Sequence, residues 1–110
     1  NDLSIHLQGG AKINLMIKAE DVSVISEGGV ILTLNGIAQT LDIRLYGAGH
    51  IDAENLKTGD VKFRIEGVGT GIVYAVNTLN AEIIGAGKIK YSGNPRVSKN
   101  IQGLGSVENE

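Results

Sequence analysis

The chain has 110 residues, a formal net charge of −2 and no cysteine, so it is the size of one small domain without disulfides or thiolate metal sites. The slight negative charge provides no basic field for nucleic acid. With one phenylalanine and no tryptophan, a core must be made of Val, Ile, Leu and Ala. The apolar runs are too short for a membrane-spanning helix. We expect a single domain over residues 1–110, trimmed or processed at its start because Asn1 is not Met.

The first half of each predicted unit is a strand that ends at a glycine. Glycine clusters begin every 18 to 20 residues, at Gly9, Gly28, Gly47, Gly67, Gly85 and Gly103. The residues two, four and six positions before these glycines are apolar in sixteen of eighteen cases, the exceptions being Ser26 and Lys99. The inward residues of the first and fourth units are Leu3, Ile5, Leu7, Val61, Phe63 and Ile65. Strict alternation of this kind predicts six equivalent half-buried strands.

The second half of each unit is a shorter apolar ladder after the glycines. Its predicted inward residues, in chain order, are Ile13 and Leu15, Leu32 and Leu34, Ile51 and Ala53, Ile72 and Tyr74, Ile89 and Tyr91, and Val107. An apolar corner residue follows in four units, at Ala19, Ile37, Leu56 and Val76. Gly71 is one residue more than the neighbouring units have, and we expect a small bulge there. No useful stretch shows the period of a helix.

Two all-β folds are compatible with these strands, a meander or sandwich and a parallel solenoid. The same residue type recurs at the same place in every unit, which favours the solenoid, because its coils stack identical positions above one another. We predict a single-stranded right-handed parallel β-helix of about six coils, with 18–20 residues in each. Stacking in register would also place Asp42 beside Lys62 and Arg64 beside Glu82, two favourable pairs on the outer surface.

The glycine-rich stretch "GVGTG", Gly67 to Gly71, has two interpretations. A phosphate-binding loop would require a helix after it, because the helix N-terminus supplies the positive end. The residues that follow, "IVYAV", favour a strand instead. Six occurrences at one period favour tight turns, where glycine permits positive φ and close approach of backbones. The glycines assigned to these turns are Gly28, Gly47, Gly49, Gly67, Gly69, Gly85, Gly87, Gly103 and Gly105.

The two histidines and the turn acids offer little metal chemistry. His6 and His50 are two or more coils apart at surface or turn positions, so we expect no metal ion shared between them. The stretch "GAGHID" offers one carboxylate, Asp52, to a calcium-binding roll that needs one in every turn. We therefore predict no metal site, no cofactor-binding residue and no catalytic residue.

Carboxylates supply the alternative of an enzyme. Asp52 and Glu54 share an outward face and Asp60 lies in the turn "KTGD", which leaves a polysaccharide lyase or hydrolase as the least favoured hypothesis. These acids are interspersed with lysine and arginine, as on ordinary solvated surfaces. Tyr74 and Tyr91 should stack in adjacent coils. A carbohydrate platform is one interpretation of this pair, and a place in the core or at a strand end is the favoured one.

The C-terminal third carries the pattern of a family. The stretch "GAGKIKYSGNPRVSKNIQGLGSVE", Gly85 to Glu108, has the form G-x-G-x-I-x-Y-x-G-x-P-x-V followed by G-x-G-S-V. Together with "LYGAGHIDAENL" and "TGDVKFRIEGVGTGIV" upstream, it resembles the bacterial putative auto-transporter adhesin family with the head GIN domain, over roughly Gly28 to Glu108. The resemblance implies the C-terminal portion of that domain, a right-handed β-helix on an exported protein of the cell envelope or cell surface. It carries over no catalytic residue.

Three functional hypotheses follow. The first is a non-catalytic envelope or surface module that binds a glycan or a protein, and the third is the polysaccharide lyase or hydrolase. The second is a structural solenoid that stacks on other copies through its coil ends, as bactofilin-like solenoids do. Leu3, Ile5 and Leu7 form an apolar N-terminal strand with an unprotected edge, which predicts pairing by dimerisation or with residues further upstream. At the other end Pro95, Lys99 and the tail "ENE" blunt the edge.

Overall fold

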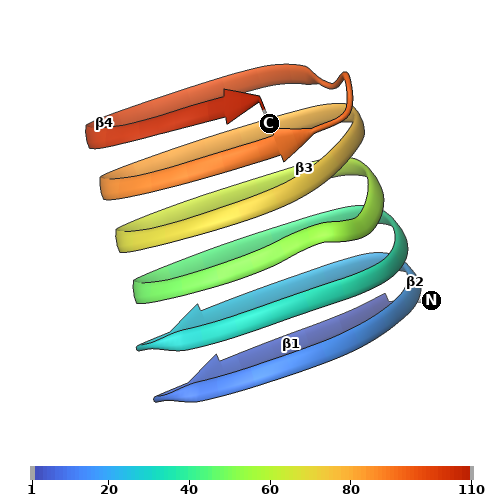
Figure 1. Cartoon of the computed structure of the whole chain (residues 1–110), viewed down its shortest axis with the longest axis horizontal. Helices are drawn as coiled ribbons and strands as arrows, with labels where there is room; N and C mark the ends of the chain where they lie inside the picture. The colour runs from blue at the N-terminus through green and yellow to red at the C-terminus, as the bar shows by residue number, and fades with distance from the viewer. Residues whose placement is uncertain (1, 110) are drawn as a thin grey trace.

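Nearly every residue lies in a strand, and the strands coil around one axis (Figure 1). The computed structural model describes residues 2–109. Its strands are β1 (Asp2–Gln8), β2 (Ala11–Glu27), β3 (Val30–Ser92) and β4 (Arg96–Asn109). They form one sheet in the order β1-β2-β3-β4, and every pairing between them is parallel. None of these described residues belongs to a helix long and apolar enough to cross a membrane.

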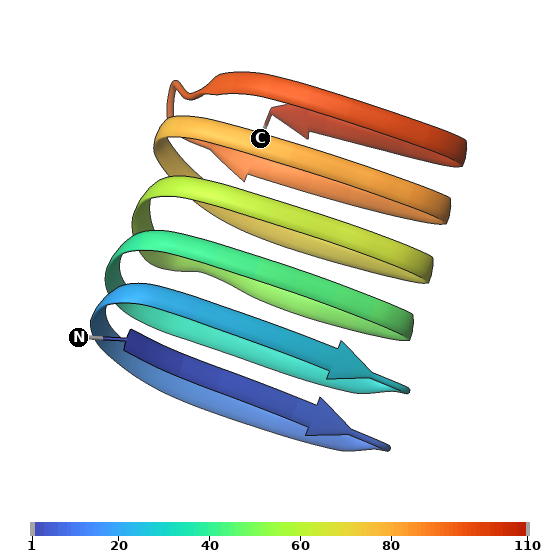
Figure 2. The ribbon, with the colours of Figure 1, turned by 180° about the vertical axis from the view of Figure 1, so that it is seen from behind.

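Each coil lies on the previous one with a shift of one sequence repeat. Leu3 pairs with Val22 and Val22 with Leu41, a shift of 19 residues, and Leu79 pairs with Val97, a shift of 18. In Figure 1 the near strands run left to right as the chain rises, and Figure 2 shows the same sense from behind, so the coil is right-handed. The predicted right-handed parallel β-helix of about six coils is confirmed.

Every coil is flattened into two faces joined by a narrow and a wide edge. The first face starts each coil, and its segments are residues 2–8, 21–27, 40–46, 60–66, 78–84 and 96–102. The second face, nearer the viewer in Figure 1, comprises residues 11–16, 30–35, 49–54, 69–74, 87–92 and 105–109. Glycines form the narrow edge between them, and the wide edge leads to the next coil. The shortest extent of the molecule is 19 Å, which fits two faces packed across one layer of side chains.

The core is a continuous layer of apolar side chains between the two faces. Its largest fully buried members are Leu32, Leu34, Leu41, Ile43, Leu45, Ile51, Leu56, Phe63, Ile65, Leu79, Ile83 and Ile89. Ser26 is buried as well, and its hydroxyl has no hydrogen-bond partner among the described residues. Lys99, the other polar residue at a predicted inward position of the first face, is exposed in the last coil. Most apolar inward residues of the first and last coils are only partly buried, because the described chain covers each of these coils on one side.

The turns of the narrow edge require glycine because the backbones of successive coils approach closely there. Gly67 has a φ of +123° and Gly85 a φ of +112°, in the left-handed region where an L side chain is strained. A Cβ at Gly85 would lie 2.5 Å from the carbonyl oxygen of Gly67. The corner glycines therefore stack directly on one another, which aligns each coil with the one before it.

The second face of the fourth coil differs from the prediction by one residue. Val73 and Ala75 are buried, whereas Ile72 and Tyr74, the predicted inward pair, are partly exposed and face outward. Gly71 occupies the next inward place, and a Cβ there would lie 2.4 Å from two carbons of the Phe63 ring. At Gly71, where a bulge was expected, the layer of inward side chains lacks one side chain. The ring of Phe63, the only phenylalanine of the sequence, fills this space.

The expected stacking of Tyr74 and Tyr91 is wrong, and two of the four corner residues are exposed. Tyr91 packs against the core, but Tyr74 faces outward, so the two rings do not stack in one column. Ile37 and Val76, the expected corner residues of their coils, are 52% and 43% exposed. Ala38 takes the inward place beside Ile37, since alternation along the strand continues into the wide edge.

Filling the gap at Gly71 should destabilise the fold. Gly71→Ala would press a methyl group against Phe63, and we expect the free energy of unfolding to fall by about 1–3 kcal/mol, the usual cost of overpacking. Urea unfolding followed by far-ultraviolet circular dichroism measures this loss. The double variant Gly71→Ala/Phe63→Leu should recover part of it, because the smaller side chain leaves room for the methyl group. Equal stability of Gly71→Ala and the parent chain would contradict this account of the core.

Candidate functional site

A network of charged side chains covers part of the first face. Arg64 Nη2 donates to Glu66 Oε1 at 2.9 Å, and Arg64 Nη1 lies 3.9 Å from Glu82 Oε1 in the next coil. The hydrogen bond to Glu66, together with the charges of both glutamates, raises the pKa of Arg64. The predicted neighbours Arg64 and Glu82 are thus in contact. Asp42 and Lys62 line one hollow, but no ion pair joins these two described residues.

Aspartate and threonine alternate where the first face begins. Thr40 Oγ1 donates to Asp21 Oδ1 at 2.6 Å, and Thr78 Oγ1 donates to Asp60 Oδ1 at 2.7 Å. The hydrogen bond from Thr40, followed by one with Asp2, lowers the pKa of Asp21. Asp60, one of the three acids considered for catalysis, is therefore bound to the coil that follows it.

The other two acids considered for catalysis make a local contact on the second face. Asp52 Oδ1 accepts the backbone N–H of Glu54 at 3.1 Å. Asp60 lies away from them, where the wide edge meets the first face. These three carboxylates do not face one another across a groove, so they do not form the pair of acids that a polysaccharide hydrolase needs.

The two histidines lie on opposite faces of the solenoid. On the first face, His6 Nε2 is 3.7 Å from Glu27 Oε2. On the second face, His50 Nδ1 shares a hydrogen bond with Thr70 Oγ1 of the next coil. Within residues 2–109, no group of three or more His, Cys, Asp or Glu residues is arranged to hold a metal ion.

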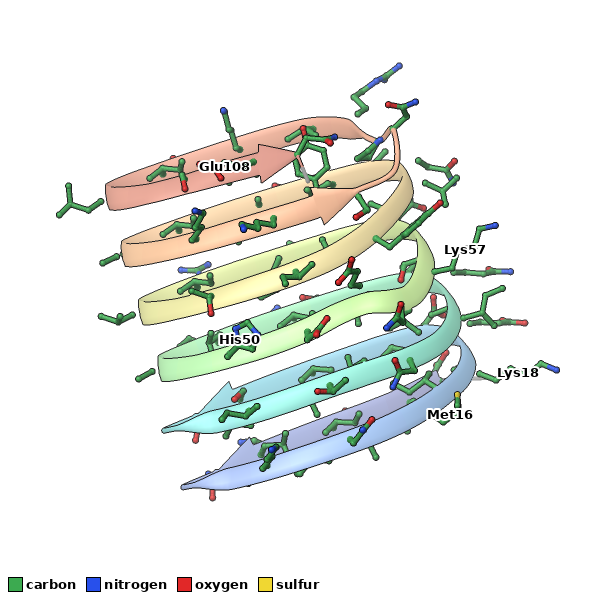
Figure 3. The ribbon with its side chains drawn as sticks, viewed as in Figure 1. Met16, Lys18, His50, Lys57 and Glu108 are labelled. Atoms are coloured by element: carbon green, nitrogen blue, oxygen red, sulfur yellow. The ribbon has the colours of Figure 1, made fainter. Side chains whose placement is uncertain are left out.

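A shallow groove runs along the wide edge across the first four coils. It consists of hollows of about 330 and 320 Å³ that share Ile37, and the larger one also includes Val76. Both of these apolar residues are exposed, at 52% and 43%. Lys18 and Lys57 project from the same edge (Figure 3). The groove therefore combines an apolar centre with charged borders.

A smaller hollow of about 210 Å³ lies on the second face between the third and fifth coils. His50, Thr70, Lys88 and Lys90 line it. It adjoins a flat hollow of about 420 Å³ on the narrow edge, which is lined mostly by glycine and alanine with Val68 and which shares Thr70 and Lys88. Sequence reasoning missed this region. The signal was the residue that follows each second corner glycine, which is His50 in "GAGH" and Lys88 in "GAGK".

The predicted association edge lies at one end of the solenoid. Leu3, Ile5 and Leu7 belong to β1, which pairs with β2 alone. Leu3 is 36% exposed, and Ile5 and Leu7 are partly buried against the core. Within residues 2–109, the outer side of β1 therefore has no partner strand.

The chain is similar to proteins described as putative adhesins. The model of the family "Putative auto-transporter adhesin, head GIN domain" matches residues 1–95. A putative adhesin from Parabacteroides merdae ATCC 43184 is similar in structure, with 21% identity, a TM-score of 0.70, and coverage of 99% of this chain and 62% of that chain. A putative adhesin from Bacteroides fragilis NCTC 9343 has 27% identity and a TM-score of 0.57, with 97% of this chain and 56% of that chain covered. No curated protein matches the sequence.

The extent of the family match differs from the resemblance seen in the sequence. The resemblance was expected over roughly Gly28 to Glu108, but the match begins at residue 1 and ends at Pro95. It therefore includes the first coil and ends before β4. The chain spans 62% and 56% of the lengths of the two solved chains. Its correspondence to the C-terminal portion of the domain stays a prediction.

Proposed function

The chain belongs to the putative auto-transporter adhesin family with the head GIN domain, and we propose that it is a non-catalytic module of an exported envelope or surface protein that binds a partner. The family match over residues 1–95 is the observation that carries this proposal. The structurally similar protein from Bacteroides fragilis is also described as a putative adhesin. The partner is a glycan or a protein displayed on another surface.

The geometry supports binding in preference to catalysis. Asp52, Glu54 and Asp60 do not converge, so these acids offer a bound substrate no paired general acid and base. The surface instead has shallow hollows that cross several coils, at the wide edge and on the second face. Because stacked coils repeat the same outward position, such a surface presents regularly spaced contacts to an extended partner.

Direct binding measurements test this proposal. We expect the folded chain to bind saturably in at least one arm of a screen that includes extracellular glycans, matrix proteins and intact cell surfaces. A heat-unfolded sample is the control for nonspecific adsorption. A lack of saturable binding in all three arms would contradict the proposal. Turnover of uronate polymers that is lost in Asp52→Ala or Glu54→Ala would contradict it as well.

A second function, self-association through the N-terminal edge, is favoured by the incomplete burial of β1. Exposed strand edges pair readily with other chains. We propose a second copy as the partner, stacked end to end so that Val97 of one copy covers Leu3 of the next. Val97 and Leu3 lie in one inward column of the solenoid, so this contact would extend the core. Lys99, which falls in the column of Ile5, makes the interface weaker than the contact between internal coils.

Analytical ultracentrifugation of the 110-residue chain tests the edge. We expect dimers or longer assemblies that increase with concentration. Leu3→Lys should weaken association by about tenfold or more, because it places a charge against an apolar edge. Met16→Lys is the matched control, since it changes an 82%-exposed side chain of the same coil that points away from the core (Figure 3). A chain that is monomeric at every concentration would refute this second function.

A further inference from the structure

A row of basic side chains runs along the second face, parallel to the solenoid axis. Lys12, His50 and Lys88 occupy the same outward position in the first, third and fifth coils. The contacts that fix this column are Lys12–Ile31, Val30–Gly49, His50–Thr70 and Gly69–Gly87. Stacked coils are about 4.8 Å apart, so successive members of the row are about 10 Å apart. All three side chains lie outside the apolar core.

Hydrogen-bond donors converge at the fifth-coil end of the row. Lys88 and Lys90 alternate outward along one strand and line the hollow of about 210 Å³ together with His50 and Thr70. Lys90 is partly buried, and no ion pair reaches it from any other residue between 2 and 109. An ammonium group with reduced access to water gains from an anionic partner. The hollow is thus suited to a carboxylate or sulfate group.

A carboxylate of the chain itself already lies at the border of this hollow. Glu108 pairs in register with Lys90, and its Oε2 atom is 3.5 Å from Lys88 Nζ. Both side chains are about half exposed, at 46% and 51%, so this ion pair is weak and an external anion can replace it. Figure 3 shows Glu108 and His50 on the same face. Glu108 therefore acts as a competitor for the site.

The surroundings of the row favour a polysaccharide over an acidic peptide. Between the ends of the solenoid, the coils use their backbone N–H and C=O groups to pair with one another, so the second face offers a peptide no strand edge to join. The adjoining narrow-edge hollow is flat and lined mostly by small residues with Val68, which suits the C–H face of a sugar ring. Asp52 lies two residues after His50 on the same strand. Its carboxylate accepts a hydrogen bond from the backbone N–H of Glu54, on the side of the wide edge.

We propose that the second-face site formed by His50, Thr70, Lys88 and Lys90 binds an anionic group of an acidic polysaccharide. The polymer lies along the solenoid axis, and its further anionic groups follow the row of Lys12, His50 and Lys88. A linear chain with one anionic group in about every 10 Å would match this row. The inference rests on the proposed binding function and names the chemical class of its ligand.

Calorimetric titration with oligogalacturonates of increasing length tests the proposal. We expect binding that strengthens with length, since longer oligomers reach more than one basic side chain. Binding should disappear when the carboxylates are methyl-esterified, and it should weaken strongly at about 1 M salt, where charges are screened. A sulfated oligosaccharide should bind in the same salt-dependent way. Inorganic phosphate distinguishes a site for any free anion, and phosphate binding as tight as that of the oligomers would overturn the proposal.

Matched variants locate the site on the second face. Lys88→Met/Lys90→Met keeps the aliphatic stems and should weaken binding by about tenfold or more. Glu108→Gln should strengthen it by about two- to fivefold, because the competing carboxylate is removed. Lys62→Met changes an exposed lysine of the opposite face and should leave affinity unchanged. Circular dichroism of each variant confirms that it is folded before the titration.

Two further outcomes would overturn the inference. One is equal binding by the Lys88→Met/Lys90→Met and Lys62→Met variants, and the other is equal binding of the esterified and free acids. Saturable binding of an uncharged glycan or a protein in the wider screen would leave the proposed function intact under either outcome. The failure of the ligand class is therefore distinguishable from the failure of the binding function.

Discussion

The close contact between the backbones of stacked corner glycines is the constraint on which the rest of the structure depends. A Cβ at Gly67, Gly85 or Gly103 would lie 2.4–2.6 Å from the carbonyl oxygen of the corner glycine one coil earlier. Any L side chain would force the neighbouring backbone to shift, and the positive φ at these positions would strain it independently. Each corner is thereby placed directly above the previous one. The alignment at the corners also sets the register of both faces. Inward residues therefore stack into a core, and outward residues stack into columns.

Differences in coil length are absorbed at the wide edge, away from the corner glycines of the narrow edge. His50 bonds to Thr70, 20 residues later, whereas Asp60 bonds to Thr78, 18 residues later. The segment from His50 to Asp60 in the third coil therefore has two more residues than the segment from Thr70 to Thr78 in the fourth. The exposed side chain of Ile37 and the larger of the two wide-edge hollows occur in the same region.

Sequence reasoning recovered the first face because two signals coincide there, the glycine period and an alternation with polar residues between apolar ones. Val61, Phe63 and Ile65 are separated by Lys62 and Arg64, so one register alone buries the apolar set. On the second face of the fourth coil, "IVYAV" is apolar throughout, and alternation cannot choose between Ile72 and Val73 as the inward residue. That choice depends on the volume of Phe63, which needs a glycine opposite it. This complementarity joins residues on different faces and is not visible in periodicity.

The outer surface was the least predictable part, for a related reason. Single outward residues such as His50 and Lys88 are ordinary surface residues when each is considered alone. They become a row only when the coils are stacked with the correct shifts of 19, 20 and 18 residues. Alignment of the coils on their corner glycines places Lys12, His50 and Lys88 in one column. Because the stacked coils repeat one outward position along the axis, these separate basic side chains lie in one line.

The stability of Gly85→Ala, measured by urea unfolding beside that of Gly29→Ala, tests the role of the corner contacts most directly. A Cβ at Gly85 would meet the carbonyl oxygen of Gly67 at a φ of +112°, whereas a Cβ at Gly29 would have no atom within 4 Å. We expect Gly85→Ala to lose about 2 kcal/mol or more of unfolding free energy and Gly29→Ala to change it by less than about 0.5 kcal/mol. Similar small changes in both variants would contradict the claim that the corner glycines hold the coils in register.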